Sequence, residues 1–170
     1  MAIFRHALLL LLIASGAPAA EPVAHRVLAA DKGKVAIIAA DGNVEWEFAN
    51  GAECHDLWLL PNHNVLLALS PTTVAEVSPD KAVVWKYEAK PKAGPKGRVE
   101  VHAFQPLPDG RVLVAESGNR RIIEVDRAGK IVKEIPLTVD KPDPHRDTRM
   151  VRKLDNGHYL VCHEGDGTVR

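Results

Sequence analysis

The 170-residue sequence has no excess of charge of either sign, because 22 lysine and arginine residues balance 22 aspartate and glutamate residues. A chain without net charge has no overall field that attracts nucleic acid or an anionic membrane surface. We therefore expect no nucleic-acid partner.

Cysteine is scarce, with Cys54 and Cys162 alone. Two thiols make no disulfide framework, and their spacing matches no zinc or haem motif. The repeat described below puts Cys54 just before one strand and Cys162 inside another strand two units later, so we expect no disulfide between them.

Long apolar runs are missing except near the start of the chain. Arg5 and His6 precede an apolar run over residues 7–14, and the small residues Ala17, Ala19 and Ala20 follow it. This is the plan of a secretory signal peptide, and the run is too short to span a bilayer. The sequence predicts a signal peptide over 1–20 and a secreted or periplasmic mature chain over 21–170, without a stable membrane span after cleavage.

The sequence also lacks helical periodicity, and it contains an internal repeat instead. Shifting the sequence by 47 residues superposes like residues, and a second shift of 47 continues the match. The first shift brings His55, Pro61, Leu66, Leu67 and Ala68 onto His102, Pro108, Leu113, Val114 and Ala115, and the second brings Gly110, Leu113, Val114, Gly118 and Ile122 onto Gly157, Leu160, Val161, Gly165 and Val169. A shift of 39 adds an earlier unit, and the difference of 8 is the polar loop 90–97. A fixed period of this length indicates a propeller or an array.

Within a unit, short runs rich in valine, isoleucine and leucine alternate with turns. The third unit predicts strands over 99–105, 112–116, 121–126 and 130–135, with an Asp-Gly hairpin signal at Asp109 and Gly110. Four antiparallel strands per repeat predict an all-β chain, a β-propeller of four-stranded blades. A β-sandwich is the main alternative, but it does not predict the repeat.

The predicted blades cover about 25–50, 55–88, 99–136 and 148–170, the last incomplete. Known propellers close with about four to eight blades, so about three and a half blades make an incomplete propeller. We expect either truncation at Arg170 or assembly with other copies, and favour truncation.

Two stretches resemble known repeat families. The run from Val114 to Asp126, with its Gly-Asn-Arg turn, resembles an NHL repeat, and the runs ending in Trp46 and Trp85 look like the Gly-x-x-x-Trp element of PQQ-binding-like propeller repeats, although Lys133 stands where the third unit lacks this Trp. The resemblance implies an exported bacterial propeller of the PQQ-like and NHL-like kind, a group in which many members have no assigned reaction. Quinoproteins of the related fold often use a vicinal disulfide, which this chain cannot form, so bound PQQ is not expected and no other cofactor is assigned.

Three histidines form the main candidate site. His55 and His102 occupy equivalent positions at the start of the innermost strand of two blades, and His145 lies in the connection to the next blade. The three imidazoles could face one central opening as metal ligands or as catalytic acid and base groups. The alternative is that each ring simply hydrogen-bonds a neighbouring blade. Asp56 and Asp147 could orient the rings or cap strands.

A second, weaker candidate is the turn formed by Asn119, Arg120 and Arg121. Arginine could bind a carboxylate or sulfate here, or the turn could hold an internal salt bridge. His63 and His158 fall in turns on the opposite face, where we expect exposure to solvent.

Together these features predict a binding or interaction scaffold that presents its loop face to a protein, peptide or saccharide. The alternative is a propeller enzyme with a histidine-lined central site, similar to arylsulfotransferases, lactonases or quinoproteins. The two differ in whether histidines and carboxylates converge on one substrate position.

Overall fold

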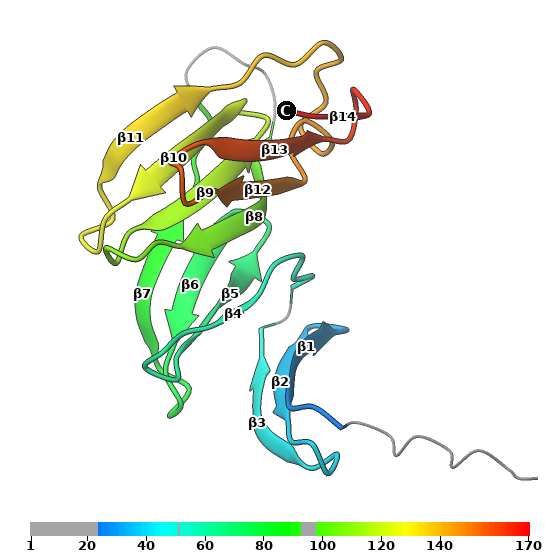
Figure 1. Ribbon diagram of the computed structural model, residues 1–170, viewed down its shortest axis with the longest axis vertical. Coiled ribbons are helices and arrows are strands. Elements are labelled where there is room, and N and C mark those ends of the chain that lie inside the picture. Colours follow the sequence, from blue (N-terminus) through cyan, green and yellow to red (C-terminus); the bar gives the residue numbers. More distant parts are fainter. Residues whose placement is uncertain (1–23, 51, 93–97) are drawn as a thin grey trace, which may run out of the picture.

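The computed structural model describes residues 24–50, 52–92 and 98–170, so the predicted signal peptide lies outside the described residues. Every helix or strand in this part of the chain is a β-strand. The strands form four antiparallel sheets that follow one another along the sequence, and we refer to them as blades 1 to 4 (Figure 1).

The strand bounds of the four blades are as follows. Blade 1 contains β1 (Val27–Asp31), β2 (Lys34–Ile38) and β3 (Val44–Ala49). Blade 2 contains β4 (Trp58–Leu59), β5 (Val65–Ser70), β6 (Thr73–Val77) and β7 (Val83–Glu88). Blade 3 contains β8 (Glu100–Pro106), β9 (Val112–Ser117), β10 (Arg121–Val125) and β11 (Ile131–Pro136). Blade 4 contains β12 (Met150–Lys153), β13 (Tyr159–His163) and β14 (Thr168–Val169).

The four strands predicted for the third repeat are confirmed, each within about one residue of its predicted ends. The Asp-Gly hairpin between β8 and β9 is confirmed too, because Gly110 has a φ of 84°, which an L side chain rarely adopts. Figure 1 shows the outermost strands β3, β7 and β11 at the left edge of their own blades.

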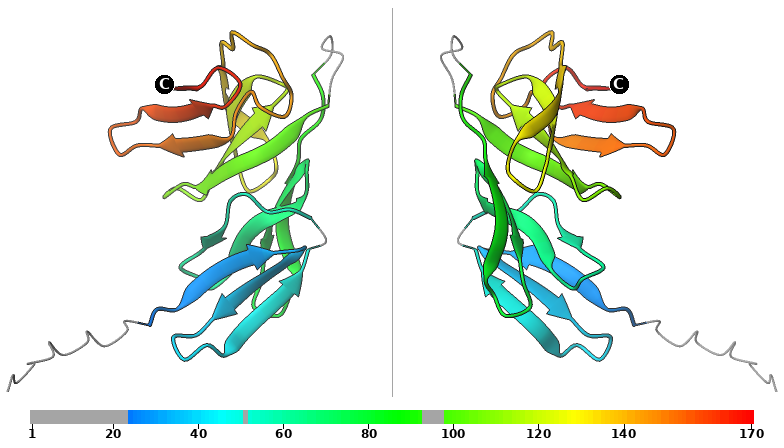
Figure 2. Two further views of the ribbon diagram at one scale, coloured as in Figure 1. Left: turned by 90° about the vertical axis from the view of Figure 1, so that its right-hand side faces the viewer. Right: turned by 90° about the vertical axis from the view of Figure 1, so that its left-hand side faces the viewer.

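Blade 1 differs from the complete unit that the sequence suggested. The shift of 39 places β1 to β3 opposite β5 to β7, so the described residues hold three strands of this blade and lack its innermost one. Blade 4 shows the two inner strands and a short third one, as the repeat predicted. Figure 2 shows blade 1 at the bottom, blade 2 above it, and blades 3 and 4 beside each other at the top.

The apolar residues of the central strands are buried on both faces of blades 2 and 3. On β5, Leu66 and Ala68 pack against blade 3, whereas Val65 and Leu67 pack against blade 1. On β9 the same alternation sends Val114 toward blade 2 and Leu113 toward blade 4. Successive strand side chains point to opposite faces, so one continuous apolar run fills two interblade cores.

Tryptophans link neighbouring blades through backbone carbonyls. The Nε1 of Trp46 donates to the carbonyl of Pro79 at 3.0 Å, and the Nε1 of Trp85 donates to that of Asp126 at 3.3 Å. Both carbonyls lie in the turn before the outermost strand of the next blade. Each tryptophan therefore packs between two blades. Nζ of Lys133, where the third unit lacks the Trp, instead lies 5.1 Å from the centre of the Tyr159 ring in blade 4.

Within the described ranges, no helix is long and apolar enough to cross a membrane.

Candidate ligand site at the inner ends of three blades

The structure brings the three predicted histidines together. His55 precedes β4, His102 lies on β8, and His145 lies in the connection that leads to β12. The ring centroids of His55 and His102 are 5.2 Å apart, and those of His102 and His145 are also 5.2 Å apart. Three blades therefore contribute one ring each to a single row, with His102 in the middle.

A β-bulge presents His102 to this row. The pairing of β8 with β9 shifts between Val101 and Ala103, so His102 is the extra residue on its strand. Its neighbours Val101 and Ala103 enter the cores on either side of blade 3, whereas His102 enters neither. Bulges commonly re-aim a side chain in this way beside functional sites.

Glu100, which was not predicted from the sequence, is the carboxylate that joins two of the rings. Its Oε2 lies 2.7 Å from Nδ1 of His145 and 3.0 Å from Nε2 of His102. Its other oxygen, Oε1, pairs with Nε of Arg98 at 2.5 Å. The one available sequence signal was its position two residues before His102 on a predicted inner strand.

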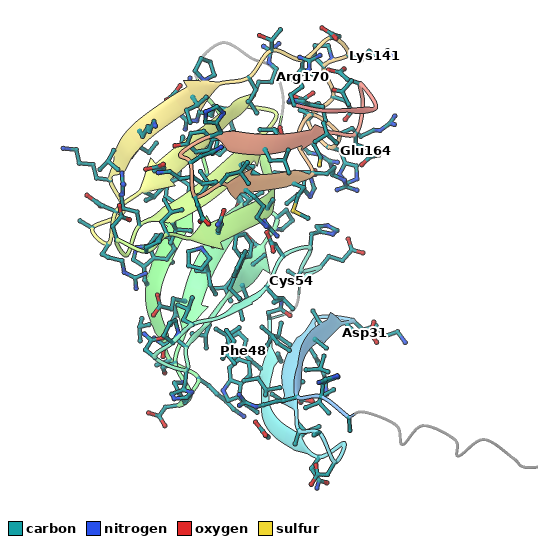
Figure 3. The ribbon with its side chains drawn as sticks, in the orientation of Figure 1. Asp31, Phe48, Cys54, Lys141, Glu164 and Arg170 are labelled. Atoms are coloured by element: carbon teal, nitrogen blue, oxygen red, sulfur yellow. The ribbon has the colours of Figure 1, made fainter. Side chains whose placement is uncertain are left out.

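Two arginines border the cluster on the side of blade 4. Arg149, which aligns with His102 in the repeat, places Nη1 3.1 Å from Nδ1 of that histidine. Its Nε pairs with Glu164 at 2.6 Å, and Arg146 pairs with the same carboxylate at 2.9 Å. Figure 3 labels Cys54, next to His55 in sequence, and Glu164, and both lie on the inner side of the blades.

Burial keeps the central imidazole neutral. His102 is 4% exposed, and this burial, together with the charge of Arg149, lowers its pKa to about 4 although Glu100 opposes the shift. The outer rings are accessible, since the side chains of His145 and His55 are 46% and 40% exposed. The cluster thus has a buried, fixed back and an accessible front.

The aspartates expected near the histidines do not contact the rings. Asp56 accepts two hydrogen bonds from Arg152, at 2.8 and 3.0 Å, and one from the backbone N–H of Phe104. Asp147 accepts the N–H of Asp143 at 2.6 Å and closes the loop before β12. Both carboxylates hold the backbone, and orientation of the rings falls to Glu100.

The turn of Asn119, Arg120 and Arg121 forms an internal network. Asn119 donates to Glu116 at 2.6 Å and to the carbonyl of Lys90, and Arg121 donates to Glu116 at 2.5 Å and to Glu134 at 2.7 Å. Tyr87 of blade 2 also donates to Glu116, at 2.5 Å, and burial raises its pKa so that it keeps its proton. Only Arg120 is exposed. Asn119 and Arg121 therefore belong to a network that links the blades, and not to the candidate site.

Gly118 allows the connections around the cluster to meet. Its φ is 84°, and a Cβ at this position would lie 2.3 Å from the carbonyl oxygen of Arg98 and 3.1 Å from Cβ of Pro144. Arg98 and Pro144 belong to the loops that precede blades 3 and 4. The turn between β9 and β10 therefore packs tightly against the two loops that carry Arg98 and His145.

A further groove lies on the face opposite the histidines. It has a volume of about 1050 Å³ and is lined by the turns that follow β4, β8 and β12, including Pro61, Pro108 and Leu154. Its charged groups pair with one another across blades, as Arg127 does with Glu76 and Lys153 with Glu124. The groove thus offers shape but few unpaired polar groups, and the sequence analysis did not predict it.

Three further histidines and the two cysteines lie outside the cluster. His63 and His158 are exposed, as predicted. His163 is buried, and its Nδ1 contacts the carbonyl of Asp147 at 2.6 Å. Cys54 and Cys162 are both free thiols.

Comparison with solved structures confirms the β-propeller fold. A Bacteroides caccae protein of unknown function is 24% identical with a TM-score of 0.67, and the match covers 88% of this chain and 57% of that protein. The WD40 β-propeller domain of Doa1 is 16% identical with a TM-score of 0.61, covering 81% and 43%. Virginiamycin B lyase from Staphylococcus aureus is 16% identical with a TM-score of 0.55, covering 87% and 54%.

The chain spans about half the length of these structures. No protein-family model matches the sequence, and no curated protein does either. At identities below 25% the likeness establishes the fold alone.

Proposed function

We propose that this chain is a ligand-binding β-propeller, which captures a protein, peptide or saccharide on its loop face at the cluster of His55, Glu100, His102, His145 and Arg149. The proposal includes export to a secreted or periplasmic location, expected from residues 1–20, and a place among propellers of the PQQ-like and NHL-like kind.

The observation that carries the proposal is the division of the cluster into a buried back and an accessible front. Glu100 and His102 are 7% and 4% exposed and are fixed by three and two polar contacts, whereas His55 and His145 remain accessible. A fixed geometry at an accessible polar surface favours recognition of a ligand, because preorganised groups lose little freedom on binding.

Arrays of peptides and glycans test this proposal with the full chain. We expect His145→Ala combined with Arg146→Ala to weaken capture of any array ligand by at least about tenfold, which corresponds to about 1.4 kcal/mol. The matched control combines His63→Ala and His158→Ala on the opposite face and leaves capture unchanged. Capture that is insensitive to the first pair, or sensitive to the second, contradicts a loop-face site.

An enzymatic function is the second candidate, and the contact between Glu100 and His145 favours it. With Nδ1 of His145 donating to Glu100, its Nε2 is left as a proton acceptor at the accessible front, the arrangement of an oriented general base. A histidine-to-alanine variant of virginiamycin B lyase from Staphylococcus aureus, crystallised with quinupristin, is catalytically inactive. That propeller supplies a precedent for an essential histidine.

A substrate panel of aryl sulfates, lactones and cyclic depsipeptides tests this second candidate. We expect turnover of one class by the wild-type chain and loss of that turnover in His145→Ala. Absence of turnover across the panel, or full activity in His145→Ala, favours the binding function instead.

A further inference from the structure

We propose that Glu100, His102 and His145 bind one divalent transition-metal ion of the zinc class, which leaves coordination positions open toward the front of the cluster. This inference rests on the proposed function, because it names what occupies the candidate site.

The three ligand atoms already converge. Glu100, His102 and His145 each offer one ligand atom within 4.8 Å of the other two. Oε2 of Glu100 lies 2.7 Å from Nδ1 of His145 and 3.0 Å from Nε2 of His102. Tetrahedral zinc with bonds of about 2.0–2.1 Å needs ligand atoms about 3.3 Å apart. Outward shifts of a few tenths of an ångström would make these two separations those of a metal site.

The types of ligand select the class of metal. Two imidazoles and one carboxylate suit zinc and its neighbours in the transition series, whereas calcium and magnesium prefer oxygen ligands alone. Three protein ligands also leave room for a water molecule or a ligand group, as in catalytic zinc sites with two histidines and a glutamate. The metal would then connect the buried residues to whatever binds at the front.

The supporting contacts orient the ligands. Arg98 pairs with Oε1 of Glu100 at 2.5 Å, which leaves Oε2 turned toward both rings. Glu100 and His102 lie on one strand and are nearly fully buried, so two of the three ligands are on a rigid element. Outer contacts of this kind commonly fix the ligands of metal sites.

The positive charge of Arg149 opposes the binding of a metal ion, so replacing this residue has an effect of defined direction on metal affinity. Its guanidinium lies 3.1 Å from Nδ1 of His102, where its charge repels a metal ion, although Glu164 at 2.6 Å partly neutralises it. Replacing Arg149 by glutamine therefore tightens metal binding, an effect opposite to that of losing a ligand.

Calorimetric titration of the tag-free full chain with Zn²⁺ tests the inference. We expect one ion per chain, and Glu100→Gln and His145→Ala each weaken binding by more than the roughly 10- to 100-fold that loss of an outer contact costs. Arg149→Gln strengthens binding, and the His63→Ala plus His158→Ala control leaves it unchanged. Because His145 is half exposed, its variant keeps the test valid even if Glu100→Gln fails to fold.

Several results would overturn the inference: no zinc bound by the wild type, binding unchanged in His145→Ala, binding lost in the control, or weaker binding in Arg149→Gln. Repeating the peptide and glycan arrays with EDTA separates it from the proposed function. If ligand capture depends on His145 but the chain binds no zinc, the metal-binding inference is refuted and the proposed function is retained. If the chain binds zinc but captures no peptide or glycan in a way that depends on the cluster, the proposed function is refuted and the metal-binding inference is retained.

Discussion

Glu100 and Glu124 are buried carboxylates of the same blade with different surroundings. Glu124 on β10 is 0% exposed and is bonded by Lys153 at 2.7 Å and Tyr159 at 2.5 Å, both from blade 4, with Arg111 at 2.6 Å. Glu100 on β8 is almost as buried, but Arg98 is 71% exposed and His145 is 46% exposed. The partners of Glu124 link blades 3 and 4 within the protein, whereas two partners of Glu100 are accessible at the surface. We call the first a closed network and the second an open network.

This difference separates a structural network from a candidate site. Glu116 resembles Glu124, because Tyr87, Asn119 and Arg121 surround it and link blade 2 to blade 3. Buried carboxylates thus join successive blades wherever their donors are internal. Only at Glu100, among these three, do accessible imidazoles form part of the network, and the comparison can be broken or sharpened by mutation.

The largest effect is expected from Glu124→Ala. It leaves Lys153 and Arg111 without their buried partner between blades 3 and 4, and breaking such a pair costs about 3 kcal/mol. Thermal unfolding should shift down by about 6–12 °C on this estimate. Glu100→Ala is the matched change and should cost less, about 1 kcal/mol, because Arg98 and His145 are exposed and can turn to water. Equal losses in the two variants would abolish the distinction between closed and open networks.

Gly118→Ala comes next in size. The added Cβ would lie 2.3 Å from the carbonyl oxygen of Arg98 in a backbone region with a φ of 84°. We expect a loss of about 1–3 kcal/mol in the free energy of unfolding. Gly165→Ala, at the equivalent turn of blade 4, is the control, since its nearest neighbour is the carbonyl oxygen of Lys141 at 3.3 Å. Chemical denaturation of both variants measures the difference, and a larger loss at Gly165 would contradict the tight contact at Gly118.

The pH dependence of stability distinguishes the networks further. Burial alone would raise the pKa of Glu124, but the hydrogen bonds from Lys153 and Tyr159 outweigh it and hold the pKa below the ordinary 4.5. As the pH falls below 4.5, the unfolded chain binds a proton first, so this contribution to stability is present above that pH and is lost as the pH falls through the folded value.

Denaturant unfolding of the wild type and of Glu124→Gln between neutral and acidic pH measures this contribution. The wild type should lose stability more steeply below pH 4.5 than the variant does. Glu76, whose pKa is also lowered against the effect of burial, by Asn64 and Arg127, adds a slope common to both chains. Identical acid slopes in the two proteins would show that Glu124 carries no such contribution.

The sequence predicted the blades far better than the site. Alternating apolar residues such as Leu66 and Val65 repeat with the strand period, so their burial on two faces is a local pattern that repeats in every unit. The meeting of His55, His102 and His145 followed from the expected order of inner strands. Glu100 was missed because its significance comes from His145, 45 residues later, and from a bulge that no local pattern marks.

The repeat alignment identified one pair of equivalent positions without revealing that their side chains are in contact. Arg149 aligns with His102 in the repeat, but the sequence did not show that the two side chains meet across blades 3 and 4. The same limit applies to Asn119 and Arg121, whose donors suit either an external anion or an internal carboxylate. Only the positions of Glu116 and Glu134 decide that these donors are used internally.

The smallest effect is expected at Arg120, the exposed member of the turn that joins β9 to β10. Its φ is 51°, a conformation that glycine adopts readily, and no described side-chain contact holds its guanidinium. Arg120→Gly should therefore change the free energy of unfolding by no more than about 0.5 kcal/mol. It should also leave array capture and zinc binding at the wild-type level, whereas Arg121→Gln should lower stability by withdrawing donors from Glu116. If Arg120→Gly instead weakens capture without a loss of stability, the ligand-binding surface extends from the histidine cluster to this turn. The turn would then belong to the open network of blade 3.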